Sequence, residues 1–326
     1  SRAEVAFSSD GRLLVSASAD PKNTCIWNAR SGRLKHELQG HRHDVLSAVF
    51  SPDGQMVVTA SADHTARLWD VLSGNELAVL SAHDGPVLSA AFSPNGKRVI
   101  TTSADKNARV WDVEKGAGLV TLQGHSDKIY SAAFSPDGLR VATVSKDHTV
   151  RIWNAATLDQ LSITLRGHKD ALNAVAFSPS GGEILTSSDD KTTKVWNTRD
   201  GQLITELKGL SNLKPSFREK TLGEVNSAIF SPNGRFVVTS SSDRKVIVGD
   251  GQRSSHGKQL TYTPARIWDW KSGKMVQSFK GFKTGVAFSI YSADGNRLLT
   301  ASDGRAKDGF LNAFGQMPAS FIASVI

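Results

Sequence analysis

The chain carries a tryptophan followed by Asp or Asn at six places, and most of them are evenly spaced. The pairs are Trp27-Asn28, Trp69-Asp70, Trp111-Asp112, Trp153-Asn154, Trp196-Asn197 and Trp268-Asp269. The first five follow one another at intervals of 42, 42, 42 and 43 residues, and the sixth follows after 72. A constant interval of this size indicates stacked copies of one structural unit. We expect individual function where the interval breaks.

One complete copy, residues 40–82, reads as four short strands with three tight turns between them. Apolar runs predict strands over residues 45–50, 56–59, 66–69 and 76–80. Turns are predicted at Ser51-Pro52-Asp53-Gly54, Ala62-Asp63-His64 and Ser73-Gly74. Such turns are too short for a crossover helix, so the sheet must be an antiparallel meander. One such sheet buries both of its faces only when neighbouring sheets cover it, as in a propeller.

The first turn of the copy recurs in seven places and sets the number of units. Its versions are SSDG at 8–11, SPDG at 51–54, SPNG at 93–96, SPDG at 135–138, SPSG at 178–181, SPNG at 231–234 and SADG at 292–295. The sequence therefore predicts an all-β, seven-bladed propeller of four-stranded antiparallel blades, formed as a single domain by residues 1–326. The expected blades are approximately 1–39, 40–81, 82–123, 124–166, 167–208, 209–280 and 281–326, with the seventh degenerate.

A glycine-histidine pair opens several copies, at Gly40-His41, Gly124-His125 and Gly167-His168, with Ala82-His83 as a variant. Together with the turns and the Trp-Asp pairs, these motifs resemble those of the WD40 repeat family, and the resemblance covers nearly the whole chain. In that family a His, a Ser or Thr, an Asp and the Trp form a hydrogen-bonded set in each blade. The resemblance implies four sets here: His41, Ser61, Asp63 and Trp69; His83, Ser103, Asp105 and Trp111; His125, Ser145, Asp147 and Trp153; His168, Ser188, Asp190 and Trp196.

Ser, His and Asp also form the catalytic sites of nucleophilic hydrolases, so a catalytic role for these residues has to be considered. The triplet repeats four times at one spacing, whereas an enzyme needs one site, so we expect a structural role and no catalytic residues. His41-Arg42-His43 has no second ligand pair at zinc-like spacing. Residues 251–258 depart from the phosphate-loop pattern, and Gln259 stands where a Ser or Thr would hold Mg²⁺. We therefore expect no metal and no cofactor.

The sixth copy contains two insertions. About 19 residues are added between Asp243 and Trp268, and about 11 before Phe230, relative to the second copy. Because loops of a meander alternate between its two ends, both insertions leave from the same end of the blade, which we call the top rim. Residues 208–266 hold ten Lys or Arg and four Asp or Glu. The segment is either a solvated loop or a surface that binds a partner.

The resemblance also implies contact positions along the top rim, on residues that flank the start of each first strand and precede each turn Asp. In blades four to six these positions carry polar groups and one aromatic side chain, which is a candidate hot spot. The expected partner-binding residues are Lys128, Tyr130, Lys146, Asn173, Asp189, Glu224 and Asn226, joined by Arg244, Lys245, Arg253 and Lys258 of the insertion.

Three functions are compatible with this pattern. The first is a non-enzymatic scaffold or adaptor that binds an acidic protein or peptide on the top rim. The second is a ligand-sensing or autoinhibitory domain of a larger STAND or apoptosome-like signalling NTPase, whose partners are other domains of its own longer chain. The third is nucleic-acid or phosphoinositide binding by the basic sixth blade, which the few aromatics there, Phe217 and Tyr262, disfavour.

Composition and the chain ends add a few expectations. The formal net charge of +8 permits an acidic partner. The absence of a long apolar run or a secretion signal, with a single Cys25, predicts a cytoplasmic protein, or a nuclear one in a eukaryote. We expect the chain, which lacks an initiator Met, to be cut from a longer one. The seventh blade should contain strands at Val286–Tyr291 and Arg297–Ala301, Phe310 at the Trp position and an outer strand at Phe321–Ile326.

Overall fold

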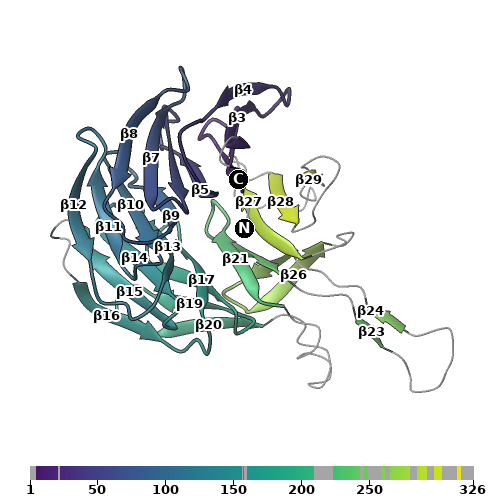
Figure 1. The fold of residues 1–326 in the computed structure, drawn as a ribbon. Coiled ribbons are helices and arrows are strands. Elements are labelled where there is room, and N and C mark those ends of the chain that lie inside the picture. Colours follow the sequence, from purple (N-terminus) through teal and green to yellow (C-terminus); the bar gives the residue numbers. More distant parts are fainter. Residues whose placement is uncertain are drawn as a thin grey trace. The chain divides into compact units, whose positions relative to one another are not determined.

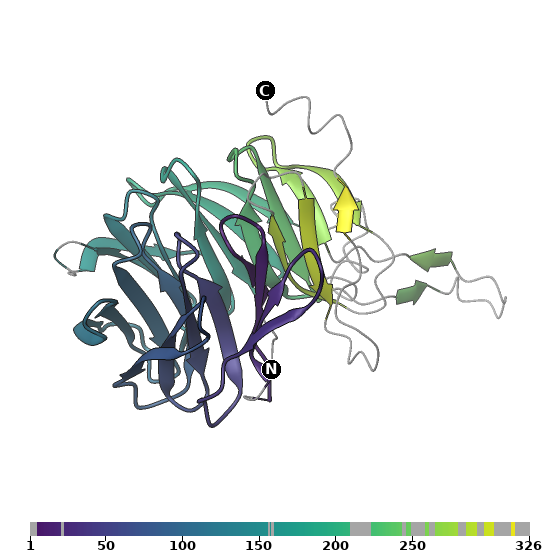
Figure 2. The ribbon, with the colours of Figure 1, turned by 90° about the horizontal axis from the view of Figure 1, so that it is seen from above.

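Each repeat folds into antiparallel strands that pair in chain order, and tight turns join the strands of the second and third repeats. The computed structural model describes residues 5–20, 23–155, 157, 160–208, 223–242, 246–248, 258–260, 265–279, 285–291, 297–302 and 314–316. It separates into two units, unit 1 (residues 1–184 and 197–202) and unit 2 (residues 185–196 and 203–326). Within each sheet of Figures 1 and 2 the strands lie side by side.

Unit 1 contains four complete four-stranded sheets, in the orders β1-β2-β3-β4, β5-β6-β7-β8, β9-β10-β11-β12 and β13-β14-β15-β16. The strands are β1 Val5–Phe7, β2 Leu13–Ser16, β3 Cys25–Asn28, β4 Leu34–Glu37, β5 Val45–Phe50, β6 Met56–Ser61, β7 Thr65–Asp70, β8 Glu76–Ser81, β9 Val87–Phe92, β10 Arg98–Ser103, β11 Ala108–Asp112, β12 Ala117–Leu122, β13 Ile129–Phe134, β14 Arg140–Ser145, β15 Thr149–Asn154, β16 Gln160–Arg166 and β17 Leu172–Phe177.

The division between the units falls within the sheet of β17, β18 (Glu183–Ser188), β19 (Thr192–Asn197) and β20 (Leu203–Lys208). Unit 2 also holds the sheet β21-β22-β25-β26, the pair β23-β24 and the three-stranded sheet β27-β28-β29. These strands are β21 Val225–Phe230, β22 Phe236–Ser241, β23 Val246–Val248, β24 Lys258–Leu260, β25 Ala265–Asp269, β26 Lys274–Phe279, β27 Val286–Tyr291, β28 Arg297–Ser302 and β29 Phe314–Gln316.

The predicted strands of the second copy are confirmed within two residues at each end, and the reason is local. In the first turn, Gly54 has a φ of 72° and its N–H donates to Ser51 O at 2.9 Å. Glycine takes this left-handed conformation without steric cost. Asp53 Oδ1 accepts from the Ser51 hydroxyl at 2.5 Å and from the Gln55 N–H at 3.0 Å, which closes the turn.

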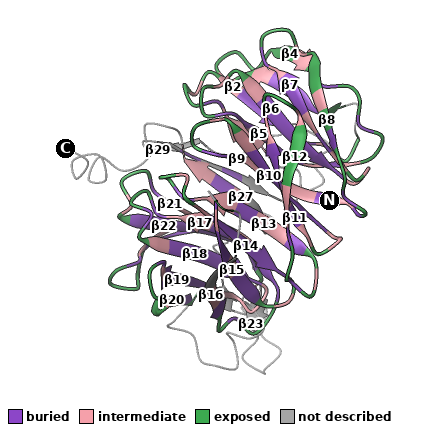
Figure 3. Ribbon diagram, turned by 90° about the vertical axis from the view of Figure 1, so that its left-hand side faces the viewer, coloured by how far each residue is buried: buried purple, intermediate pink, exposed green. Residues whose placement is uncertain are grey.

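Burial follows the position of a strand in its sheet. In β6 five of six residues are buried, because neighbours cover both faces and both edges. The outer strand β12 has only one buried residue, Leu122, and Figure 3 shows it largely exposed. The apolar second and third strands are therefore the interior of each repeat, and the outer strand faces solvent.

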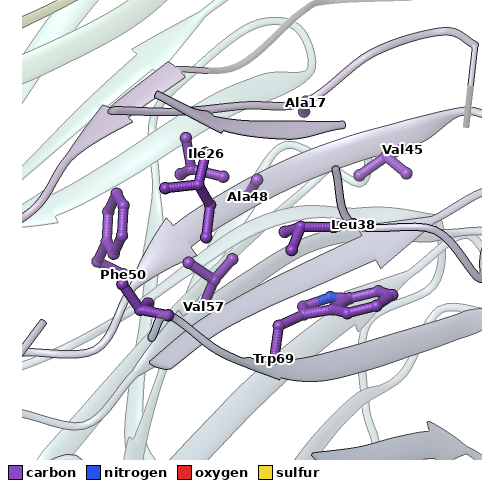
Figure 4. Packing of buried hydrophobic residues seen from close by; sticks show 10 residues of the cluster. Ala17, Ile26, Leu38, Val45, Ala48, Phe50, Val57 and Trp69 are labelled. Atoms are coloured by element: carbon purple, nitrogen blue, oxygen red, sulfur yellow. The ribbon is translucent and has the colours of Figure 1, made fainter. Parts of the chain in front are cut away.

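Adjacent sheets bury their faces against one another, as the first pair in unit 1 shows. Ile26 and Leu38 of the first repeat share one core with Val57 and Trp69 of the second, and Figure 4 shows these side chains gathered between the strands. Trp69 is 1% exposed. Burying an indole of this size contributes about 4–6 kcal/mol before conformational entropy is counted.

The sixth repeat keeps its sheet in spite of the predicted insertion between its second and third strands. β22 pairs with β25, with Val237 opposite Trp268, as Val57 lies opposite Trp69 in the second repeat. The inserted residues contain β23 and β24, which pair only with each other among the described strands. The earlier insertion, residues 209–222, lies outside the described residues.

The seventh repeat needs one correction. Its first two strands are confirmed as β27 and β28, but the third strand is β29, where Gly315 lies opposite Leu298. In the other sheets a tryptophan takes this place, so Gly315 rather than Phe310 holds the Trp position. A sequence pattern without Trp gave no landmark for the third strand. Phe310 and residues 321–326 lie outside the described residues.

The turn between second and third strands places a non-glycine residue in the left-handed region in four repeats, with φ of 66–72° at His64, Lys106, His148 and Lys191. A side chain there costs about 1–2 kcal/mol. We expect Lys106→Gly to raise the free energy of unfolding by about 0.5–1 kcal/mol after the entropy of glycine is subtracted. Urea denaturation measures the change. The exposed Lys97, whose φ is not positive, is the control, and Lys97→Gly should lower stability.

Candidate functional site

The second, third and fourth repeats each contain a buried hydrogen-bonded set that joins two strands to the residues before the first strand of the repeat. In the second repeat, His41 Nδ1 lies 2.8 Å from Asp63 Oδ2, and His41 Nε2 lies 2.7 Å from Thr59 Oγ1. The indole Nε1 of Trp69 donates to the same Thr59 oxygen at 2.8 Å. The imidazole of His41 is fully buried. The set therefore ties β6 and β7 to the residues that precede β5.

The predicted sets require a correction in their hydroxyl member. Thr59, Thr101 and Thr143 stand between His and Trp, in place of the predicted Ser61, Ser103 and Ser145. The serine lies two residues later on the same strand face, at the start of the turn. There the Ser61 hydroxyl donates to His43 O and accepts from the Asp63 N–H, both at 3.1 Å. In these three repeats the threonine stands ten residues before the tryptophan and the serine eight, and this spacing is the only difference that the sequence offers.

The tryptophan contact extends to repeats that lack the histidine. Trp27 donates to Ser16 Oγ at 2.9 Å and Trp268 donates to Thr239 Oγ1 at 3.0 Å. In the fifth repeat Trp196 donates to Thr186 Oγ1 at 2.9 Å, within unit 2. His168 belongs to unit 1, whereas Ser188, Asp190 and Trp196 belong to unit 2, where Thr186 takes the place of the predicted Ser188 as the hydroxyl that accepts from the indole.

The hydrogen bonds define where the protons are. Because the indole is only a donor, Thr59 accepts from Trp69 and donates its own proton to His41 Nε2. His41 then carries its proton on Nδ1 and donates it to Asp63. This arrangement needs a neutral imidazole beside an ionised carboxylate. Both nitrogens of His41 are used inside the set, so neither is available as a catalytic base.

The pKa values agree with this assignment. Burial lowers the pKa of His41 below its ordinary value, and the hydrogen bond to Asp63 opposes only part of that effect. Burial alone would raise the pKa of Asp63, but hydrogen bonds from Thr65, the Arg42 N–H and His41 outweigh it and hold that pKa far below its usual range. The pKa values of His83 and Asp105 are lowered for corresponding reasons.

The part of the chain that the structure describes offers no metal site. Among those residues, no three His, Cys, Asp or Glu side chains gather where they could hold a metal ion. The repeated Ser, His and Asp side chains form hydrogen bonds that hold the strands of each repeat together. The described residues also include no helix that could span a lipid bilayer.

The predicted rim positions are brought together in pairs by a repeated backbone hydrogen bond. In four repeats, the residue before the turn Asp donates its backbone N–H to the carbonyl of the residue just before the first strand. This bond joins Ala62 to Asp44, Ala104 to Pro86, Lys146 to Lys128 and Ser242 to Glu224, at 2.9, 2.9, 2.9 and 3.0 Å. The backbone of the rim is thus constant, and only the side chains differ.

A one-residue β-bulge lies beside each of these pairs. In β13 the register shifts between Ile129 and Ser131, so Tyr130 is the extra residue. The corresponding bulged residues are Leu46, Leu88 and Asn226. A bulge bends the strand and changes the direction of a side chain, and bulges are frequent beside functional sites. Alternation along the strand could not reveal this extra residue.

Unit 1 exposes the side chains that the rim hypothesis needs. Lys128 is exposed, Tyr130 is half-buried, and the Lys146 side chain is 50% exposed with its Nζ 3.9 Å from Asp127 Oδ2. Asn173 is half-buried on β17. An ion pair this long and exposed contributes little to stability, so Lys146 can exchange Asp127 for another anion at small cost.

Unit 2 presents its predicted residues differently. Asp189 is half-buried and Glu224 is exposed, but Asn226 is buried and its Nδ2 donates to Val286 O at 2.9 Å. This expectation is corrected, because the Asn226 amide serves the packing of β21 against β27. Three insertion residues, Arg244, Lys245 and Arg253, lie outside the described residues, and Lys258 lies in β24, of which only the backbone is described.

Comparison with known families agrees with this geometry. Five segments, residues 32–70, 74–112, 116–154, 159–197 and 212–250, match the family described as "WD domain, G-beta repeat". Together they cover more than half of the chain. The chain therefore belongs to the WD40 repeat family.

Individual relatives match over short stretches. The chain is 41% identical over 66 residues to the chromatin assembly factor 1 subunit FAS2 homolog of Oryza sativa subsp. japonica, which is 20% of this chain and 13% of that protein. It is 34% identical over 64 residues to the periodic tryptophan protein 2 homolog of Neurospora crassa, 20% of this chain and 7% of that protein. It is 45% identical over 60 residues to the nuclear distribution protein PAC1 of Arthroderma otae, 18% of this chain and 13% of that protein.

The role of Thr101, which contacts both the histidine and the tryptophan, can be tested by comparison with its neighbour Thr102. Thr101 Oγ1 contacts both His83 Nε2 and Trp111 Nε1 at 2.8 Å, whereas the buried Thr102 Oγ1 has no hydrogen-bond partner among the described residues. Thr101→Val leaves two buried polar groups unpaired and should lower the free energy of unfolding by about 2–4 kcal/mol. Thr102→Val should change it by less than about 1 kcal/mol. Equal losses in chemical denaturation would contradict the assigned role of Thr101.

The buried sets also predict acid sensitivity. Lowered pKa values of His83 and Asp105 mean that the unfolded chain binds more protons, so stability falls as pH falls. The histidine contribution is lost below about pH 6.5 and the aspartate contribution below about pH 4. Urea midpoints between pH 7.5 and 5 measure the first part. His83→Gln should flatten this slope, whereas the exposed His43, changed to Gln, should leave it intact.

Proposed function

We propose that this chain is a protein-interaction scaffold without catalytic activity, and that it binds an acidic protein or peptide at the top rim. The observation that carries the proposal is the constant rim backbone with variable side chains. The pair is Asp44 with Ala62 in one repeat and Pro86 with Ala104 in the next, but Lys128 with Lys146 in the fourth. A fixed frame that presents different side chains is suited to recognition rather than to catalysis.

The chemistry of the fourth repeat favours an acidic partner. Lys128 and Lys146 bring two positive charges to positions joined by one backbone hydrogen bond of 2.9 Å. Tyr130 lies two residues after Lys128, on a bulge. A tyrosine beside cationic groups offers apolar area and a hydroxyl to a carboxylate-bearing segment, and such residues are frequent hot spots. Long-range attraction by these lysines would accelerate association and weaken with salt.

The relatives support the general role. Their names describe a subunit of a chromatin assembly factor, a nuclear distribution protein and a subunit of translation initiation factor 3, and two of these three are subunits of larger assemblies. The buried free thiol of Cys25 agrees with a reducing compartment. We propose the cytoplasm or the nucleus as the setting.

Charge reversal at one end of unit 1 tests the proposal. Partners captured from native lysate by the chain would be identified and their affinities measured. We expect Lys128→Glu with Lys146→Glu to weaken binding about tenfold or more, and Tyr130→Ala to cost about 2 kcal/mol. The control is Lys97→Glu with Lys115→Glu. This double variant changes the net charge by the same amount, but its residues lie in turns at the strand ends away from the top rim.

The control should change affinity by less than about twofold, because rim charges act locally at physiological salt. Equal effects of the two double variants would mean that only net charge matters. Capture abolished by nuclease would identify a nucleic acid in place of a protein partner. Either result overturns the proposal.

A further inference from the structure

The turn between the second and third strands has the geometry of a hairpin loop that ordinarily contains glycine. In the second repeat the His64 N–H donates to Ser61 O at 3.3 Å, and His64 has a φ of 72°. The corresponding residues of the third and fourth repeats, Lys106 and His148, have φ of 71° and 66°. A turn that ends in a left-handed residue favours glycine there, because a side chain is strained in this conformation. These three repeats therefore keep a side chain at a position where it costs stability.

The chain uses glycine where the same conformation occurs at the other end of the second and third repeats. The turns at the strand ends away from the top rim contain left-handed residues with φ of 59–75°, which are Gly54, Gly74, Gly96 and Gly116. At the top rim the left-handed residue is a histidine or a lysine in each of the second to fifth repeats. The fifth, Lys191, belongs to unit 2 and is left aside. Backbone strain that is kept at one end only indicates a function for these side chains.

The three side chains in unit 1 are accessible to a partner. His64, Lys106 and His148 are all exposed. The side chains of His64 and Lys106 form no hydrogen bond or ion pair with another residue in the described part of the chain. His148 Nε2 lies 4.0 Å from Asp170 Oδ1, and both side chains are about half exposed or more. A contact this long between exposed groups contributes little, so none of the three side chains is needed for the fold.

The buried sets hold these turns in one conformation. Asp63, which binds His41 through Oδ2, accepts the N–H of Thr65 through Oδ1 at 3.0 Å. Asp105 and Asp147 accept the corresponding bonds at 2.9 and 3.0 Å. The backbone is thus fixed on both sides of the left-handed residue. A side chain on a fixed backbone loses less conformational entropy when a partner binds.

We propose that His64, Lys106 and His148 form a second row of contacts along the top rim of unit 1, which binds an extended acidic segment of a partner protein. The lysine ammonium and the imidazole N–H groups would donate to carboxylates. The inference rests on the proposed function, because it extends that acidic partner from the fourth repeat to the third and second. In the second and third repeats the rim pairs joined by the backbone hydrogen bond carry no cation, so the left-handed residues add donors there.

The spacing of the row determines the kind of acidic segment that fits it. The sheets of the second, third and fourth repeats pack face to face in sequence within unit 1. Packed sheets lie about 10 Å apart, and an extended chain advances about 3.3 Å per residue. A segment with an acidic side chain at about every third residue therefore meets one turn after another, whereas a block of acidic residues does not.

The test uses the full chain and a fluorescent peptide of repeated Glu-Ser-Gly, compared with a peptide of the same composition whose Glu residues form one block. Fluorescence anisotropy at low ionic strength measures affinity. We expect the spaced peptide to bind about threefold or more tightly than the blocked one. Lys106→Gly should weaken binding of the spaced peptide about threefold, and His64→Gly with Lys106→Gly and His148→Gly should weaken it about tenfold, because each exposed contact contributes modestly.

The glycine substitutions relieve backbone strain, so stability and affinity should change in opposite directions. Lys106→Gly should have a higher urea midpoint than the native chain and yet bind the spaced peptide more weakly. Lys97→Gly removes the same charge at the opposite end of the strands and should change affinity by less than about twofold. Equal affinity of the native chain and the triple glycine variant, equal losses from Lys97→Gly and Lys106→Gly, or equal binding of the two peptides would overturn the inference.

Capture of the native partner separates this inference from the proposed function. If Lys128→Glu with Lys146→Glu weakens capture and the triple glycine variant does not, the rim proposal stands and the second row fails. If only the triple glycine variant weakens capture, the second row stands and the lysine pair of the fourth repeat fails.

Discussion

The structure depends on one repeated interaction, the hydrogen bond from an indole, half-buried at Trp27 and buried in the other five cases, to a hydroxyl on the neighbouring second strand. It occurs at Trp27, Trp69, Trp111, Trp153, Trp196 and Trp268. The indole is large enough to fill the space between two sheets, and its one polar atom must be satisfied there. In the second to fourth repeats the same hydroxyl also donates a hydrogen bond to a histidine, whose other ring nitrogen donates to an aspartate. Packing and polar satisfaction therefore act on the same side chain.

The same interaction decides which segment is built into the sixth sheet. Two segments have the third-strand pattern, one ending in Gly249-Asp250 and one in Trp268-Asp269. Only the second can bury an indole and satisfy Thr239. The other segment is left as a separate strand pair. A competition of this kind is decided by tertiary packing, because both segments satisfy the local pattern.

The residues that stabilise the fold differ from those proposed to bind a partner. The residues that repeat, such as Thr101, His83 and Trp111, are buried and saturated with hydrogen bonds. The rim positions share a backbone hydrogen bond but carry Asp, Pro, Lys or Glu. Because the frame is held from within, the rim side chains can change without loss of the fold. That freedom agrees with the proposed scaffold, in which the exposed Lys128 and the half-buried Tyr130 would bind the partner.

The period of the Trp-Asp pairs and the turn motifs were enough to predict the all-β class and the four-stranded meanders. They also predicted the strands of the second repeat and the first two strands of the seventh. These features follow from local patterns of hydrophobicity and from turn residues, which act over a few positions. Tertiary structure alone decided that Thr59 rather than Ser61 joins His41 to Trp69, that Tyr130 lies on a bulge, and that Asn226 is buried against β27. Two hydroxyls on one strand face look equivalent in sequence, and only the position of the indole across the sheet distinguishes them.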